Sequence, residues 1–288
     1  MASKQLQLLL NASLAIEAED AKEAGRLGFM ARGLVQATMP HSNTGGSHHK
    51  RVNGNYSLTM TAGDPDVGLP YGSIPRLILS WLATEAVRKK ERELILGDSM
   101  SGFMRELNLV PTGGRWGSIT RLKDQSRRLF GCMISCSNVN PDGVATKNLL
   151  IADNSELWWH KTAPNQSGLF ESTVTLSQGF FDEIIQNPVP VDMLALKALK
   201  RSPMAIDIYC WLTYRMSYLR RPTSIPWELL QAQFGCDYPD TAQGKAHFKQ
   251  KFNQHLKSVL VVYPEAKLEA SKDSLTLKPS KTHVKKIA

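Results

Sequence analysis

The side chains of this sequence best suited to binding chemistry lie along an expected helix over residues 242–260. Residues 241–259 contain four lysines, two histidines and no acidic residue. Helical spacing places five polar side chains on one outer face: Gln243, His247, Gln250, Gln254 and Lys257. Two further lysines, Lys249 and Lys251, lie on the flanks of this face. A helix that only faces solvent usually carries glutamates to pair with its lysines, so this pattern favours an anionic partner. Glutamine can bond adenine twice and lysine can contact guanine or phosphate, so we predict contact with duplex DNA.

A second expected helix, over residues 113–130, offers a similar but weaker surface. Its predicted outer face and entrance carry Arg121, Gln125 and Arg128, with Arg127 beside them and Arg115 at the start. Asp124 stands four residues before Arg128, so part of this charge is expected to be neutralised within the helix. The predicted buried stripe of this helix is Trp116, Ile119, Leu122, Ser126, Leu129 and Phe130. A solvated polar face with no ligand is the alternative interpretation for both helices.

Catalytic chemistry is not supported by the residue pattern. The Gly-rich string at residues 113–118 lacks the lysine and the spacing of a phosphate-binding P-loop. The four cysteines form no CxxC pair, and the histidines are scattered or sit in the Gly-rich stretch around His48. We therefore predict a protein that is not an enzyme and has no cofactor and no metal site. A nuclease that nicks one strand is the rival from the enzyme class.

The elements that must position these helices follow one order twice. Each copy is expected to run helix, short strand, helix, turn, helix and β-hairpin, with landmarks repeated at an offset of about 130 residues. In the first copy the hairpin is expected from residues 132–136 and 148–160. In the second copy it is expected from residues 266–270 and 275–278, with Lys272 at its tip as a phosphate contact. This order predicts an α+β fold of two tandem winged-helix domains, each a helix-turn-helix with a β-hairpin wing.

Composition agrees with a packed chain that meets an anionic partner. The 288 residues are 42% hydrophobic and carry a formal net charge of +9. Charge is concentrated in residues 71–130, with eleven basic and six acidic side chains, and in residues 190–288, with sixteen and eight. The absence of a long apolar run or a clear signal peptide predicts a cytoplasmic protein. The expected organisation is an N-terminal accessory arm and linker over 1–67, a first domain over 68–189 and a second domain over 190–288.

Several strings also resemble the RepA-type plasmid replication initiators. They are Gly68-Leu-Pro-Tyr-Gly-Ser-Ile-Pro-Arg-Leu-Ile-Leu79, Leu109-Val-Pro-Thr-Gly-Gly-Arg-Trp-Gly117, Ser202-Pro-Met-Ala-Ile-Asp-Ile-Tyr209, Trp211-Leu-Thr-Tyr214, Pro226-Trp227 and Gln231-Ala-Gln-Phe-Gly235. The resemblance runs from about Gly68 to the C-terminal residue and leaves residues 1–67 uncovered.

The resemblance implies an initiator that binds direct repeats, or iterons, in duplex DNA at a plasmid origin. It implies help in opening the origin, recruitment of the host initiator and replicative helicase, copy-number control, and an equilibrium between monomer and dimer. Dimer contacts are expected from the first domain and most base reading from the second. A winged-helix transcriptional repressor without a replication role is the main alternative, and a module that binds acidic proteins is a further one.

Overall fold

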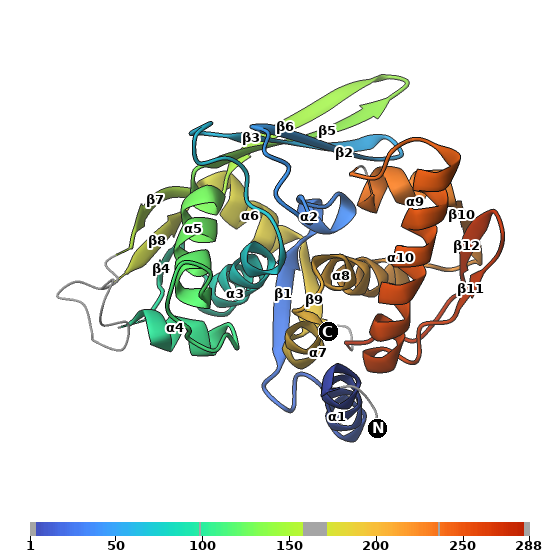
Figure 1. The fold of residues 1–288 in the computed structure, drawn as a ribbon, viewed down its shortest axis with the longest axis horizontal. Helices are drawn as coiled ribbons and strands as arrows, with labels where there is room; N and C mark the ends of the chain where they lie inside the picture. The colour runs from blue at the N-terminus through green and yellow to red at the C-terminus, as the bar shows by residue number, and fades with distance from the viewer. Residues whose placement is uncertain (1–3, 98, 158–171, 236, 285–288) are drawn as a thin grey trace.

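The computed structural model describes residues 4–97, 99–157, 172–235 and 237–284, in which two units lie on either side of a shared centre (Figure 1). The first unit consists of α3 (Ser73–Lys89), β4 (Glu93–Ile95), α4 (Met100–Glu106), α5 (Ser118–Phe130), β7 (Ala152–Glu156) and β8 (Thr173–Leu176). Its three strands form an antiparallel sheet in the order β4-β8-β7.

The second unit repeats this plan. It consists of α8 (Pro203–Tyr218), β10 (Thr223–Pro226), α9 (Trp227–Phe234), α10 (Ala242–Val262), β11 (Leu268–Ala270) and β12 (Ser274–Leu277). Its sheet has the order β10-β12-β11, so in both units the first strand pairs with the last. Local sequence explains the helix starts: Ser202 caps α8 ahead of Pro203, and Thr241 caps α10 by accepting a hydrogen bond from Gly244 N. The predicted repetition of the helix, strand, helix, helix order is confirmed, whereas the predicted hairpin of the first copy is not.

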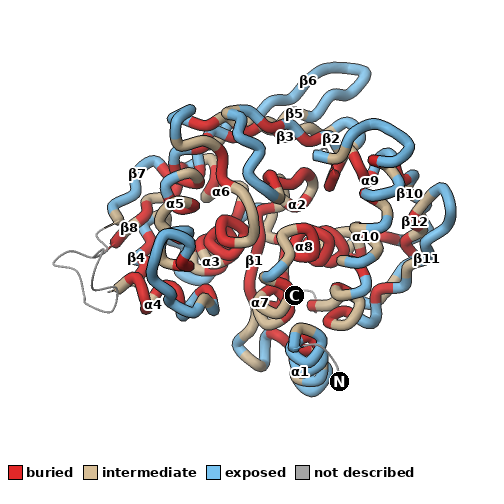
Figure 2. The backbone as a smooth tube through the Cα atoms, viewed as in Figure 1, coloured by how far each residue is buried: buried red, intermediate tan, exposed pale blue. Residues whose placement is uncertain are grey.

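The centre of the molecule is formed by α3 and α8, which are buried along most of their length (Figure 2). Between them, β1 (Leu27–Ala31) pairs with β9 (Pro188–Asp192) in a two-stranded antiparallel sheet. The remaining helices are α1 (Lys4–Ala18), α2 (Arg32–Gln36), α6 (Gln178–Gln186) and α7 (Met193–Leu199). The predicted domain boundaries stay a prediction, although β9 spans the one at 189/190 and pairs with a strand from the predicted arm. None of the helices in the described ranges is long and apolar enough to cross a membrane.

A four-stranded antiparallel sheet covers one side of both units (Figure 1). Its order is β2 (His48–Asn53), β3 (Tyr56–Ala62), β5 (Cys132–Asn140) and β6 (Gly143–Leu150). The Gly-, Ser-, Thr-, Asn- and Pro-rich composition of residues 37–70 predicts a linker or loose arm, and this prediction is wrong, because β2 and β3 come from that stretch. Within it, Gly54-Asn55 is a two-residue hairpin signal with glycine first, and Gly54 adopts the positive φ of 57° that such a turn requires.

The expected hairpin of the first unit is also corrected. Residues 132–140 pair with β3 and β6, not with the strands of the first unit's own sheet. Asp153 and Asn154 lie inside β7, at a register shift in its pairing with β8. The turn between β5 and β6 follows Asn140, in a Pro-Asp-Gly sequence of ordinary turn chemistry. The first unit thus contains an inserted hairpin that the second unit lacks. Trp158, Trp159, His160 and Cys236 lie outside the described residues.

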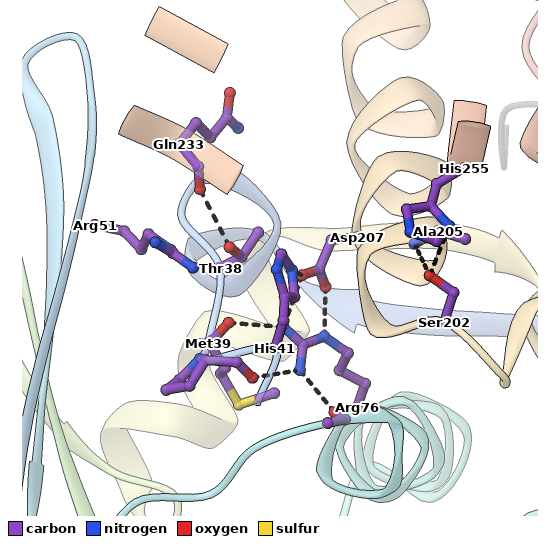
Figure 3. Close-up of polar contacts among 12 residues, drawn as sticks. Thr38, Met39, His41, Arg51, Arg76, Ser202, Ala205, Asp207, Gln233 and His255 are labelled. Atoms are coloured by element: carbon purple, nitrogen blue, oxygen red, sulfur yellow. Dashed lines mark hydrogen bonds and ion pairs between the residues drawn. The ribbon is translucent and has the colours of Figure 1, made fainter. Parts of the chain in front are cut away.

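The two units are joined by a buried ion pair between α3 and α8 (Figure 3). Arg76 donates from Nε and Nη2 to the two carboxylate oxygens of Asp207, both at 2.7 Å. Its other bonds go to the carbonyl oxygens of Met39, Pro40 and Gly72, so all five N–H donors have partners. His41 Nε2 lies 2.8 Å from Asp207 Oδ2. Burial alone would raise the pKa of Asp207, but Arg76 and His41 hold that pKa below its ordinary value.

We expect the fold to lose stability in mild acid, because it contains buried histidines. Burial, together with nearby Arg51, lowers the pKa of His49 to about 4, and burial also lowers the pKa values of His41, His255 and His283. Unfolding lets each ring take up a proton below its unfolded pKa of about 6.5. The free energy of unfolding should therefore fall as the pH drops from 6.5 toward 4.

Urea denaturation at pH 7, 6 and 5 measures this dependence. His49→Gln should reduce the slope of unfolding free energy against pH, because it removes one of the protons bound on unfolding. The matched control is His48→Gln, at the neighbouring exposed position, which should keep the wild-type slope. Equal slopes for wild type and His49→Gln would contradict the prediction.

Candidate nucleic-acid interface

The outer face predicted for α10 is exposed in the structure. Gln243, His247, Gln250, Gln254 and Lys257 are all solvent-accessible, whereas Phe248, Phe252, Leu256, Val259 and Val262 form the buried side of the helix. The apolar stripe positions this face, because the phenylalanines pack against one another and against Phe234 of α9. The predicted exposure of these five side chains is confirmed, and their contact with DNA stays a prediction.

Two lysines of the α10 surface have different surroundings. Lys249 Nζ donates hydrogen bonds to the carbonyl oxygens of Ser271 (2.9 Å) and Lys272 (2.7 Å) in the β11–β12 turn. It also lies 5.1 Å from the ring centroid of Trp227, which adds a cation–π contact. Lys249 therefore holds the hairpin against α10, while Lys251 is half-buried on the flank, as predicted. The exposed Lys272 is carried beside α10 by this arrangement.

The α5 surface is more restricted than predicted, because several of its charges have carboxylate partners. Arg128 Nε lies 2.9 Å from Asp124 Oδ2, which confirms the expected internal pair. Arg127, which is exposed, lies 3.2 Å from Asp64 of the loop after β3. Arg115 and Arg121 are exposed and make no ion pair with any described residue. These two guanidinium groups are the cations of this surface available to an anionic ligand.

Two assignments on the first helix are wrong. Gln125 is 4% exposed, where its Oε1 accepts a bond from Tyr71 N at 2.8 Å. It lies three residues after Leu122 and four before Leu129, so it shares their buried side of α5. Trp116, predicted in the buried stripe, is 81% exposed. The helix begins at Ser118, so Trp116 precedes it and does not follow the helical periodicity.

A cavity of about 730 Å³ lies between the units, and no sequence pattern predicts it. It is lined by Arg121 and Asp124 of α5 on one side and by Lys200 and Arg201, just before α8, on the other. Lys200 Nζ also donates to the carbonyl oxygen of Asn108 in the first unit. The next residue, Ser202, has its hydroxyl 3.1 Å from His255 Nδ1 of α10 (Figure 3). Residues 200–202 thus connect the surroundings of α5 to those of α10 and add two basic side chains between them.

Comparison with known proteins identifies the family. A family model described as plasmid encoded RepA protein matches residues 69–228. The chain belongs to this RepA family. The match covers the first unit and extends through α8 and β10 to the start of α9, so α10 of this RepA-family chain lies beyond it. A search of curated proteins gave no match.

The fold of the RepA-family chain is also similar to a solved structure, that of domains 2 and 3 of RctB. The TM-score is 0.55 at 12% sequence identity, and the alignment covers 88% of this chain and 96% of the RctB chain. At this identity the similarity concerns the arrangement of elements. Because it covers 88% of this chain, it extends into both units.

Proposed function

We propose that the chain is a plasmid replication initiator that binds direct repeats in duplex DNA at its origin. Membership of the RepA family supports the replication role. The observation that carries DNA recognition is the exposed amide and lysine face of α10, which has no acidic residue over residues 241–259. In this proposal Gln250 and Gln254 read base edges, and Lys257 and Lys272 contact phosphates.

Each unit fits the plan of a winged helix. The helix–strand–helix–helix order ends in two antiparallel strands, and the last of them pairs with the first strand, as in a wing. In such a domain the third helix enters the major groove, so α5 and α10 are the groove-reading helices. The β11–β12 turn, held to α10 by Lys249, is the wing of the second unit.

The arrangement of the two units is suited to binding two consecutive parts of one DNA site. Groove-reading helices of linked domains contact major-groove faces about one helical turn apart, or about 10 bp. Lys200 and Arg201, which lie between α5 and α10 at the cavity edge, would contact the backbone that joins the two faces. Opening of the origin, recruitment of the host initiator and helicase, and copy-number control through a monomer–dimer equilibrium belong to the same proposal.

A winged-helix repressor remains the second candidate, because the same surfaces would bind an operator. The deciding experiment combines footprinting on the parent replicon with a plasmid-maintenance assay. We expect protection of repeated segments of about two helical turns each. We also expect variants with a weakened α10 face to lose maintenance in step with binding. Protection only over a promoter, with maintenance independent of the protein, would favour the repressor. Strand cleavage of supercoiled origin DNA in the presence of a divalent metal would favour a nickase.

A further inference from the structure

Among the described residues, one aromatic side chain stands outside the packing that accounts for most of the others. Trp116 precedes α5 and is 81% exposed, the largest exposed fraction among the large hydrophobic side chains described. An exposed indole ring leaves a large apolar area in water and loses the stabilisation that its burial would give. Such a side chain at the entrance of a proposed groove-reading helix calls for a ligand that supplies a flat apolar partner.

The loop that carries Trp116 is held rigidly by its own hydrogen bonds. Thr112 and Ser118 bond to each other through their backbone and hydroxyl groups at 2.9–3.1 Å. The Ser118 hydroxyl also donates to Val110 O at 2.6 Å, and the Thr120 hydroxyl donates to Gly114 O at 2.9 Å. These contacts close residues 110–120 into a compact loop, so the backbone that carries the ring does not have to be ordered when a ligand binds.

Two glycines allow this closed shape. A Cβ atom on Gly117 would lie 2.2 Å from Thr112 O and 2.4 Å from Gly113 O, which no side chain can tolerate. Gly114 has a φ of 86°, in the region that favours glycine. Gly114 and Gly117 are therefore required for the loop shape that presents the tryptophan outward.

The charge around the ring indicates the kind of ligand. Arg115 Cζ lies 5.2 Å from the Trp116 ring centroid. Residues 108–123 contain Arg115, Arg121 and Lys123 but no acidic residue. The Arg115 guanidinium lies over one face of the indole ring and pairs with no carboxylate of the described residues. The opposite face of the ring fits a stacked nucleobase, with its phosphate on the arginine. A protein partner would have to present an acidic surface here.

We propose that Trp116 and Arg115 form a stacking site for an unpaired nucleobase and its phosphate. This proposal rests on the proposed function, since it assumes that the chain acts on DNA. An intact duplex offers no free base face, and opening one step costs a few kcal/mol. An unpaired base avoids this cost. The base belongs either to a free single strand or to an opened segment of duplex beside the bound α5.

The test uses the full chain and three fluorescein-labelled DNAs: single-stranded oligo(dT), an AT-rich duplex with a central bubble, and the same duplex fully paired. Fluorescence anisotropy gives the affinity for each. Trp116→Ala should weaken binding to oligo(dT) and the bubble by about 5- to 150-fold, the range expected for loss of one stacked base. Trp116→Phe should keep most of the affinity, because phenylalanine also stacks. The matched control, Val110→Ala, changes another exposed apolar residue and should have no effect.

The outcomes distinguish a free single strand from opened duplex as the source of the base, and distinguish base stacking from an ordinary duplex contact or a protein contact. Loss confined to oligo(dT) assigns the site to free single strands, and loss on both oligo(dT) and bubble includes opened duplex. Equal weakening on the fully paired duplex would overturn the proposal in favour of an ordinary duplex contact. Unchanged DNA binding by Trp116→Ala would also overturn it, and loss of self-association by that variant would then assign the ring to a protein contact. If wild type protects no repeats, the proposed function fails. If repeats are protected and Trp116→Ala binds like wild type, only the stacking site fails.

Discussion

Asp207→Asn is expected to lower the free energy of unfolding by about 3–5 kcal/mol, the usual cost of leaving one member of a buried ion pair uncompensated. The carboxylate is 8% exposed and accepts two 2.7 Å bonds from Arg76 and a contact from His41. An asparagine has the same shape but no charge, and its NH2 group is a donor that would face the N–H donors of Arg76. The loss falls on the only described ion pair that joins α3 to α8.

Urea denaturation followed by circular dichroism measures this effect at pH 7. Asp153→Asn is the matched control, because Asp153 also pairs with an arginine, Arg92 at 2.5 Å, but is 50% exposed. That change should cost less than about 1 kcal/mol. Similar losses for the two variants would show that the junction between the units contributes no special stability. Since the junction also sets where α5 lies relative to α10, weaker binding to two-turn sites should accompany the loss.

Gln250→Ala and Gln254→Ala are each expected to remove about 1–3 kcal/mol of discrimination between an origin repeat and an unrelated duplex. Both side chains are exposed on α10, away from its buried phenylalanines, so truncation should leave the fold intact. A glutamine that reads adenine bonds the base edge, so its loss lowers specific affinity and leaves non-specific affinity unchanged.

Competition binding with repeat and non-repeat duplexes at two salt concentrations measures this discrimination. Lys257→Ala should instead weaken both duplexes alike and reduce the salt dependence, because a phosphate contact carries no sequence information. Gln7→Ala, at an exposed glutamine of α1, serves as the matched control and should match wild type. Unchanged discrimination in both glutamine variants would exclude α10 as the reader.

The geometry of α10 was predictable because local periodicity controls it. Phe248, Phe252 and Leu256 repeat every four residues, which fixes the opposite face. The start of α5 was less predictable, since the Thr112–Ser118 hydrogen bonds end the preceding loop at a position that periodicity does not mark. For this reason periodicity wrongly predicts Trp116 in the core, and only the structure shows its exposure.

The long-range strand pairings were beyond sequence reasoning. The turn at Gly54 was readable, but the pairing of β3 with β5 joins residues 56–62 to residues 132–138. The pairing of β1 with β9 joins residues that are even further apart along the chain. Neither contact leaves a local signal, because a strand's alternation shows that one face is buried and not which strand lies beside it.

The amino-acid sequence by itself determined the duplicated order of elements, the family and the carboxylate-free face of α10, because these depend on residue type and short-range spacing. Only the tertiary structure decided that Arg76 meets Asp207 across the two units, that Lys249 fastens the β11–β12 turn, and that Trp116 stands in solvent. The physical reason is that burial and ion pairing depend on which distant segments the folded chain brings together.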